Sequence, residues 1–347
     1  CPGVVKRPED PVEGVKRSGP MDLAEGGTVL KKYHGTDACV IVPAGVTAIA
    51  KECFEVDAPC AEEFLALPEG LEEIGKSAFE GCSSLKRIVI PEGVRSIREK
   101  TFCECTALQE IRLPDGLELI GRSAFSECEA LQEIRLPDGL KEIGSDAFSG
   151  CRSLRQITVP VGVKCIETAV FQSCRALQEV HLPEGLEQIG MFAFEDCDTL
   201  TRIVLPASLK RLCRGAFENC TSLLEAQLPD GLEELQDDAF EYCRSLQKVT
   251  IPTQVRQIER AAFYYCQSLQ EVQLPEELNE IGEDAFAHCW ALKRIVIPAG
   301  VEKVGEHAFW ECYSLQNIAV LSDDTEIAED AFEDCPGTVK RGTGGLF

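Results

Sequence analysis

Residues 67–91 read LPEGLEEIGKSAFEGCSSLKRIVIP, and this phrase returns every 23 residues until position 335. Its proline recurs at Pro68, Pro91, Pro114, Pro137, Pro160, Pro183, Pro206, Pro229, Pro252, Pro275 and Pro298. Its phenylalanine recurs at Phe79, Phe102, Phe125, Phe148, Phe171, Phe194, Phe217, Phe240, Phe263, Phe286, Phe309 and Phe332. A fixed period of roughly 20–50 residues is typical of a solenoid, in which each repeat forms one coil and the stack buries a common core. We therefore expect one elongated domain in place of several globular ones.

The end of the phrase, residues 85–91, predicts a β-strand. Ile88 and Ile90 alternate with Arg87 and Val89, which is the two-residue period of a strand with one buried face. Pro91 lacks an N–H and therefore ends the strand pairing. The preceding residues 74–82 carry apolar side chains at spacings of three and four, which predicts a short helical or 3₁₀ turn. The inward side chains of one coil are then Leu71, Ile74, Ala78, Phe79, Cys82, Leu85, Ile88 and Ile90.

The chain divides where the period starts and stops. Residues 1–27 are rich in Pro, Gly and charge, and we expect a linker or a disordered lead-in there. Residues 28–67 are expected to form capping strands and an irregular first coil, residues 68–337 the regular solenoid, and residues 338–347 a tail. Three interpretations of the start stay open: Cys1 as the lipidated first residue of a bacterial lipoprotein, an artificial end, or a native start at Met21.

The net charge of −25 restricts the class of partner. Nucleic acid and anionic membrane surfaces both require a basic patch, so neither is expected as a partner. The sequence has no run of about 18 apolar residues, so no transmembrane segment is expected.

Nineteen cysteines first suggest disulfides or a metal site, but their spacing argues against both. Twelve of them fall in one column of the repeat, at Cys82, Cys105, Cys128, Cys151, Cys174, Cys197, Cys220, Cys243, Cys266, Cys289, Cys312 and Cys335. Stacked strands lie about 4.8 Å apart, whereas a disulfide needs converging Cβ atoms about 3.8 Å apart. A structural zinc site usually has two close cysteine pairs, and only Cys103 and Cys105 are that close. We expect buried free thiols, which favours a reducing or anaerobic setting.

The sequence contains no recognisable catalytic motif. His34, His181, His288 and His307 show neither H-x-x-x-H nor H-E-x-x-H spacing, and no P-loop, G-x-S-x-G or G-x-G-x-x-G phrase occurs. We therefore expect no enzyme, no cofactor and no bound metal.

The core L-x-x-[IV]-x-[LIV] of each coil is the leucine-rich repeat pattern. The longer phrase at residues 67–91 and the lead-in TVLKKYHGTDACVIVPAGVTAIAKECF at residues 28–54 resemble the BspA-type leucine-rich repeat family over about residues 28–335. The resemblance implies a right-handed α/β solenoid, a horseshoe or superhelix with one parallel β-sheet and short helical or 3₁₀ turns opposite. It also implies a surface adhesin or ligand binder without catalytic residues.

Outward strand positions carry charges of both signs. The phrase ALQEIRLPDGL occurs at residues 107–117 and again at 130–140, which places Glu110 and Arg112 beside Glu133 and Arg135. Such neighbours can form a cross-strand lattice of charges. We interpret this lattice as stabilising the sheet and keeping it soluble, in preference to recognising a ligand.

Aromatic residues gather in the C-terminal coils. Both tryptophans and four of the five tyrosines lie between positions 242 and 313, in three columns beside the cysteines that elsewhere hold mostly small or polar residues. The predicted ligand-binding residues are Tyr242, Tyr264, Tyr265, His288, Trp290, Trp310 and Tyr313. Because coils stack, we expect one patch with Trp290 and Trp310 exposed to solvent. Local packing of these coils, or an oligomer contact, is the alternative.

These observations favour a non-catalytic binding or adhesion module that presents an extended surface to a protein or glycan ligand. The expected location is the bacterial cell surface or the secreted fraction. An intracellular protein-interaction scaffold is the alternative, because free thiols in such number suit a reducing compartment.

Overall fold

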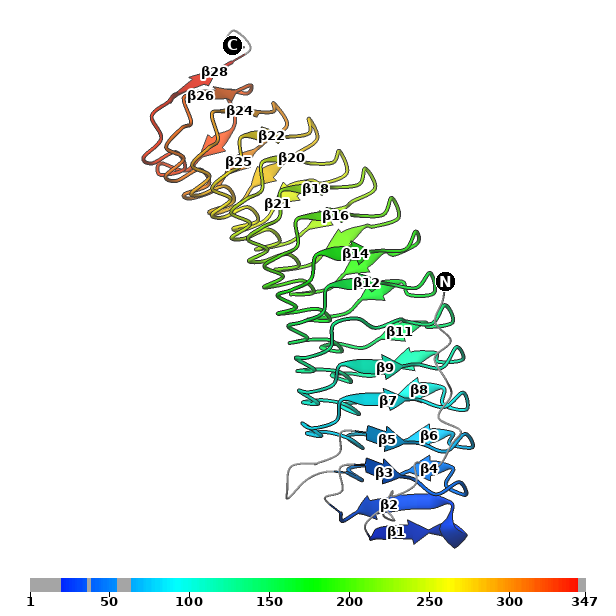
Figure 1. Ribbon diagram of the computed structural model, residues 1–347. Coiled ribbons are helices and arrows are strands. Elements are labelled where there is room, and N and C mark those ends of the chain that lie inside the picture. The colour runs from blue at the N-terminus through cyan, green and yellow to red at the C-terminus, as the bar shows by residue number, and fades with distance from the viewer. Residues whose placement is uncertain (1–19, 36–38, 55–63, 343–347) are drawn as a thin grey trace, which may run out of the picture.

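The computed structural model describes residues 20–35, 39–54 and 64–342. They form an elongated, curved stack of about thirteen coils (Figure 1). In Figure 1, tight turns line one long edge of the stack, strands cross its middle, and loops line the opposite edge. No helix in these described ranges is long and apolar enough to cross a bilayer.

Nearly every coil contributes one strand of three or four residues, taken from the end of the repeated phrase. These strands are β3 (Cys39–Ile41), β5 (Phe64–Ala66), β7 (Arg87–Val89), β9 (Glu110–Arg112), β12 (Gln156–Thr158), β14 (Glu179–His181), β16 (Arg202–Val204), β18 (Glu225–Gln227), β20 (Lys248–Thr250), β22 (Glu271–Gln273), β24 (Arg294–Ile297), β26 (Asn317–Val320) and β28 (Thr338–Arg341). They pair in parallel one repeat apart, as in Ile88 opposite Ile111. Ile88 is buried between exposed Arg87 and Val89, which confirms the predicted alternation.

A second row of parallel strands makes the expectation of a single sheet wrong. These two-residue strands are β4 (Ala48–Ile49), β6 (Glu73–Ile74), β8 (Ser96–Ile97), β10 (Leu119–Ile120), β11 (Glu142–Ile143), β13 (Cys165–Ile166), β15 (Gln188–Ile189), β17 (Arg211–Leu212), β19 (Glu234–Leu235), β21 (Gln257–Ile258), β23 (Glu280–Ile281), β25 (Lys303–Val304) and β27 (Glu326–Ile327). The cause is the turn that begins at each proline. In one coil the Val94 N–H donates to the Pro91 carbonyl at 3.1 Å, and the reversed chain then runs extended again.

The helical or 3₁₀ turn predicted opposite the sheet is also wrong, since the described part of the chain has one short 3₁₀ element, η1 (Glu25–Gly27), outside the regular coils. Residues 77–82 instead form consecutive turns. The N–H groups of Phe79 and Gly81 donate to carbonyls of the next coil at 2.9 and 2.8 Å, while Cys82 donates within its own coil to the Phe79 carbonyl at 3.1 Å. Ser77 and Gly81 have positive φ angles of 53° and 72°, which prevents a continuous helix. The equivalent turns of the described coils stack along one edge of the solenoid (Figure 1), and we call this stack the turn ladder.

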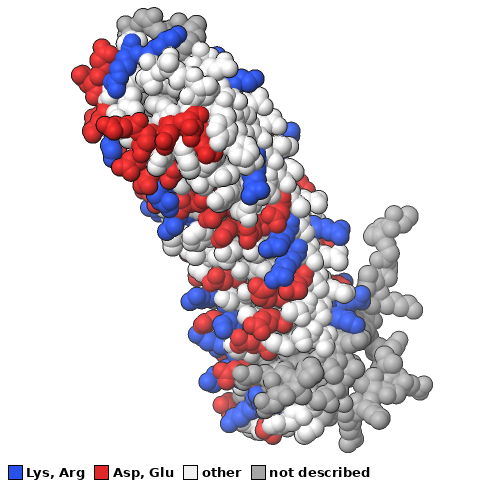
Figure 2. Space-filling model, turned by 90° about the vertical axis from the view of Figure 1, so that its left-hand side faces the viewer, with Lys and Arg blue, Asp and Glu red and all other residues white. Residues whose placement is uncertain are grey.

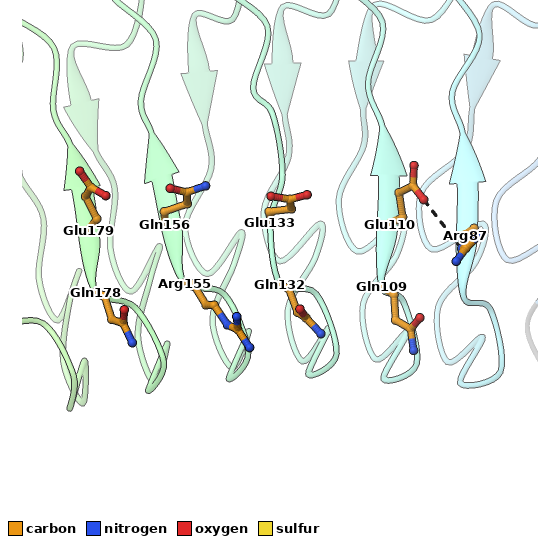
Figure 3. Close-up of a pocket in the computed structure, with 9 residues that line it drawn as sticks. All are labelled: Arg87, Gln109, Glu110, Gln132, Glu133, Arg155, Gln156, Gln178 and Glu179. Atoms are coloured by element: carbon orange, nitrogen blue, oxygen red, sulfur yellow. Dashed lines mark ion pairs between the residues drawn. The ribbon is translucent and has the colours of Figure 1, made fainter. Parts of the chain in front are cut away.

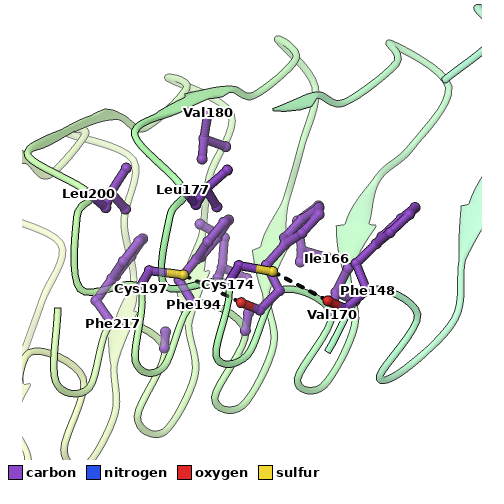
Figure 4. Packing of buried hydrophobic residues seen from close by; sticks show 14 of the residues in the cluster. Phe148, Ile166, Val170, Cys174, Leu177, Val180, Phe194, Cys197, Leu200 and Phe217 are labelled. Atoms are coloured by element: carbon purple, nitrogen blue, oxygen red, sulfur yellow. Dashed lines mark hydrogen bonds between the residues drawn. The ribbon is translucent and has the colours of Figure 1, made fainter. Parts of the chain in front are cut away.

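The core is a continuous column of side chains along the stack. Neighbouring phenylalanine rings are stacked, with centroids 5.3 Å apart between Phe171 and Phe194 and 5.2 Å apart between Phe194 and Phe217. Figure 4 shows the rings of Phe194 and Phe217 with Leu177 and Leu200 packed beside them. All eight predicted inward side chains of the first regular coil are buried.

The twelve column cysteines are free, and all but Cys335 are buried. Each thiol lies within hydrogen-bonding distance of a phenylalanine carbonyl in the preceding coil, for example Cys174 Sγ at 3.3 Å from the Phe148 oxygen (Figure 4). An S–H group is a weak donor, and this contact gives the column a polar role that the sequence did not reveal. Burial raises the pKa of thiols such as Cys151 and Cys197 well above the usual range, so they stay protonated at neutral pH.

Both ends of the solenoid extend beyond the predicted boundaries. The lead-in was expected to last through residue 27, but β1 (Met21–Ala24) pairs antiparallel with β2 (Val29–Tyr33) and covers the first edge of the stack. The expected tail from residue 338 begins with β28, which pairs with β26. Residues 1–19, including Cys1, lie outside the described residues.

Candidate functional site

The turn ladder brings all seven predicted binding residues together. We call the cluster of Tyr242, Tyr264, Tyr265, His288, Trp290, Trp310 and Tyr313 the aromatic patch. Ring centroids of neighbouring members lie between 4.1 Å (Tyr265 to His288) and 6.3 Å (Trp290 to Tyr313). Contacts at 5.2 Å between Tyr242 and Tyr265 and 6.0 Å between Tyr265 and Trp290 connect the cluster across successive coils. Aromatic pairs at such distances attract each other edge-to-face or offset.

Exposure differs from member to member. Trp290 is 38 % and Tyr313 53 % exposed, whereas the expectation for Trp310 holds only in part because its indole is half-buried. The cause is His288, whose ring centroid lies 4.7 Å from that of Trp310. His288 itself is 4 % exposed, so it forms the floor of the patch and not its surface.

Three members of the patch stand on backbone in the left-handed region. The φ angles are 56° at Tyr242, 57° at Tyr265 and 59° at His288. The same column holds Gly81 and Gly150, whose lack of a Cβ suits this conformation. The same conformation recurs in this column on every regular coil, for example at Glu104, Asn219 and Glu311, so it belongs to the repeat and does not by itself mark a functional position.

Carboxylates surround the aromatic rings. Glu311 Oε2 lies 2.9 Å from His288 Nδ1, but off the direction that a hydrogen bond requires, so the buried Nδ1 has an ionic neighbour and no hydrogen bond. A hydrogen bond to Glu311, partial burial and the negative charge nearby raise the pKa of Tyr313 to about 12. Burial, neighbouring tyrosines, Asp284 and Glu241 raise the pKa of Tyr264 to about 12. The phenols are therefore neutral hydrogen-bond donors at physiological pH.

A row of three glutamates leads into the patch and was missed at the sequence level. Glu195, Glu218 and Glu241 occupy one column on successive coils, and Tyr264 takes the next position. We call these three the carboxylate column. All are half-buried. Burial, followed by neighbouring carboxylates, raises the pKa of Glu218 and of Glu241 to about 7. The signal was visible in the sequence as a triple recurrence of Glu at one repeat position.

The two arginines near the carboxylate column, Arg214 and Arg260, form ion pairs with a different carboxylate, that of Asp238. Asp238 is 2 % exposed and is held from both sides, by Arg214 Nε at 2.9 Å and by Arg260 Nη2 at 3.0 Å. A buried carboxylate in this position needs such partners. The two guanidinium groups therefore offset the charge of Asp238 first, and Glu218 and Glu241 remain incompletely compensated. Figure 2, which faces the turn ladder, shows acidic side chains crowding its upper, C-terminal part.

The strand face holds a second surface feature, an open polar groove of about 590 Å³. Figure 3 shows its lining in two rows, one of Gln109, Gln132, Arg155 and Gln178 and one of Glu110, Glu133, Gln156 and Glu179 beside Arg87. Over the residues that the structure describes, neither Glu133 nor Arg135 forms an ion pair, so the predicted lattice between the two identical phrases is wrong. The reason is a break in the strand row, because residues 131–137 form no strand between β9 and β12. Arg112 pairs instead with Glu110 of its own strand at 3.2 Å.

Metal chemistry finds no support in the same geometry. Across residues 20–35, 39–54 and 64–342, no group of three or more His, Cys, Asp or Glu side chains is arranged to hold a metal ion.

Comparison with known proteins agrees with this architecture. Solved structures with the same fold include a leucine-rich repeat protein from Bacteroides ovatus, at 28 % identity and a TM-score of 0.75 over 95 % of this chain and 94 % of that one. They also include a leucine rich cell surface protein from Faecalibacterium prausnitzii, at 27 % identity and a TM-score of 0.60 over 97 % and 96 %. No curated protein matches the chain. The model of the BspA type leucine rich repeat region matches residues 47–174, 97–224, 141–266 and 233–340. The chain therefore belongs to the BspA-type leucine-rich repeat family.

Proposed function

We propose that this chain is a non-catalytic binding module that holds a protein or glycan ligand on its aromatic patch. The observation that carries the proposal is the continuous contact among seven ring side chains on a surface where the repeat elsewhere places small or polar residues. Tyr and Trp offer large contact areas at a low cost in side-chain entropy, and both are enriched at binding hot spots. The half-buried Trp310 and buried His288 fix the exposed rings in place.

The proposed location is the bacterial cell surface or the secreted fraction. Its support is the likeness to the cell surface protein of Faecalibacterium prausnitzii over nearly the whole of both chains. An intracellular interaction scaffold is the second candidate, and the free buried thiols of the cysteine column favour it. The aromatic patch would serve as the contact surface in either setting.

The test compares three proteins on arrays of glycans and of extracellular proteins: the wild type, Trp290→Ala/Trp310→Ala, and the control Val161→Ala/Val204→Ala. The control also removes apolar surface, since Val161 and Val204 are 70 % and 73 % exposed on other coils. We expect the tryptophan variant to lose affinity for the wild-type ligand by at least about 30-fold, which equals about 2 kcal/mol and is a hot-spot magnitude. The control should bind like the wild type.

Intrinsic fluorescence gives a second readout, because the chain has two tryptophans and both belong to the patch. Ligand binding should therefore change the emission spectrum of the wild type. Equal affinity of the wild type and the folded tryptophan variant, without any change in emission, would refute the proposed site.

A further inference from the structure

The surroundings of the aromatic patch are strongly negative. Glu241, Asp284, Glu311 and Asp334 all lie close enough to raise the pKa of patch tyrosines through their charge. His307, beside Trp310 with ring centroids 5.3 Å apart, is itself paired with acids, with Nε2 at 3.5 Å from Asp330 Oδ2. A ligand that approaches the exposed rings therefore meets a negative potential.

The patch already holds one cation against a ring. The guanidinium carbon of Arg244 lies 5.8 Å from the centroid of Tyr242, within the range in which a cation is attracted to an aromatic face. Trp290 and Tyr313 are more exposed than Tyr242, and each presents ring surface to solvent. The same attraction is available there to a cation from another molecule.

The carboxylate column extends this surface along the solenoid. Glu218 faces the like charges of Glu195, Asp238 and Asp196, and the Arg214 charge opposes them only in part. Glu241 faces Asp238 and Glu218, opposed in part by Arg260 and Arg214. Because both guanidinium groups are bound to Asp238, a new cation beside the column would relieve repulsion that the protein leaves uncompensated.

We propose that the aromatic patch and the carboxylate column together bind a short basic segment of a partner protein. Lysine or arginine side chains of that segment would lie on the exposed rings at one end and against Glu218 and Glu241 at the other. This inference rests on the proposed function and specifies its ligand. The surface spans five coil intervals from the Glu195 coil to the Trp310 coil, or roughly 25 Å at about 4.8 Å per interval. An extended peptide of roughly eight residues covers that distance.

A neutral glycan would use only half of these features. Its sugar rings could stack on Trp290 and Tyr313, but it would leave the charges of the carboxylate column uncompensated. Charge complementarity therefore favours the basic peptide, which draws on both the rings and the acids.

The experiment measures binding of fluorescently labelled peptides by anisotropy at an ionic strength of about 0.15 M, where long-range attraction to an acidic protein is largely screened. The probe is an eight-residue peptide of alternating Gly and Arg, and the matched neutral probe replaces each Arg with citrulline. The variants are Glu218→Gln/Glu241→Gln and Trp290→Ala/Trp310→Ala. The control, Glu133→Gln/Glu225→Gln, makes the same pair of substitutions on the strand face, and circular dichroism confirms that each variant is folded.

We expect the Arg peptide to bind the wild type at least about tenfold more tightly than the citrulline peptide. Each site variant should lose at least about tenfold in affinity, a change typical of one cation–ring or buried charge contact, and the control should stay within about twofold. Calorimetry in two buffers of different ionisation enthalpy gives a second readout. A cation lowers the pKa of Glu218 and Glu241, so binding near pH 7 should release protons, and this release should disappear in Glu218→Gln/Glu241→Gln.

Three results would overturn the inference: equal binding of the Arg and citrulline peptides, equal losses in the site and control carboxylate variants, or no binding of the Arg peptide. If a neutral glycan or protein on the arrays then binds through Trp290 and Trp310, the proposed function stands and only the basic ligand is wrong. If the tryptophan variant changes no interaction at all, both proposals fail.

Discussion

Replacing Phe194 with alanine tests whether the phenylalanine column stabilises the stack. The side chain has no exposed surface, and its ring lies between Phe171 and Phe217 at centroid distances of 5.3 and 5.2 Å. Replacing a fully buried Phe with Ala lowers the free energy of unfolding by about 3–5 kcal/mol, through lost transfer free energy and the cavity left behind. The two coils on either side are held by backbone hydrogen bonds and cannot close that cavity freely, so we expect the upper part of this range.

The assay is equilibrium unfolding in urea, followed by circular dichroism for the whole chain and by tryptophan fluorescence for the coils of Trp290 and Trp310. Solenoid stability is approximately a sum of coil and neighbour terms. The circular dichroism transition should therefore shift to lower urea, and amide exchange should accelerate first in the coils of Phe171 and Phe217. Val204→Ala, at a side chain 73 % exposed, is the control and should stay within about 0.5 kcal/mol of the wild type.

If Phe194→Ala lowers the free energy of unfolding by less than about 1 kcal/mol, this account of the core is refuted. It would mean that the neighbouring rings rearrange to fill the space. A uniform loss of exchange protection along the whole stack would contradict the second half of the reasoning, because it would require one cooperative unit in place of coupled coils.

The buried face of the solenoid could be predicted from sequence because each column reports the same environment many times. Ile88, Leu85 and Phe79 each represent a repeated position, and all three are buried as expected. The strand over residues 87–89 was predicted for the same reason, since alternation is a local property of strands. Repetition thus replaced the information that an alignment of homologues would supply.

The turn ladder could not be predicted because its spacing imitates a helix. The turn closed between Phe79 and Cys82 places two apolar side chains three residues apart, as a helical turn does. The difference lies in the φ angles of Ser77 and Gly81 and in hydrogen bonds to the next coil. Both depend on the neighbouring coil being present, and a single repeat read alone does not contain that information.

The candidate site likewise has features that the sequence predicts and features that depend on contacts between coils. The gathering of Trp290, Trp310 and Tyr313 followed from column arithmetic alone. The burial of His288 did not, because it depends on the rings above it. The near-neutral pKa of Glu218 likewise arises from partial burial beside Glu195 and Asp238, which only the stacking distance produces.

Three further predictions test the stack and the carboxylate column. Column thiols such as Cys128 and Cys243 should react with a thiol reagent only after denaturation, because both are buried and protonated. The half-buried Cys335 should react before them. Rapid labelling of the interior thiols in the native protein would contradict the buried cysteine column. Gly75→Ala should destabilise the protein more than Gly70→Ala in thermal unfolding, because a Cβ at Gly75 would lie 2.4 Å from the Lys51 nitrogen, whereas nothing lies within 4 Å at Gly70. Finally, Glu218→Gln/Glu241→Gln should raise the thermal midpoint at pH 8 and leave it nearly unchanged at pH 4.5. The folded pKa of both groups, about 7, lies above the usual value of 4.5, so the folded state binds protons more tightly than the unfolded chain. Their contribution to stability is therefore complete below about pH 4.5 and is lost as the pH rises through about 7, when the carboxylates ionise beside Asp238. Glutamine stays neutral throughout and avoids that loss. Thermal scans from pH 4.5 to 8 measure the effect, and a variant that melts below the wild type at pH 8 would show that the ionised column stabilises the fold instead of straining it.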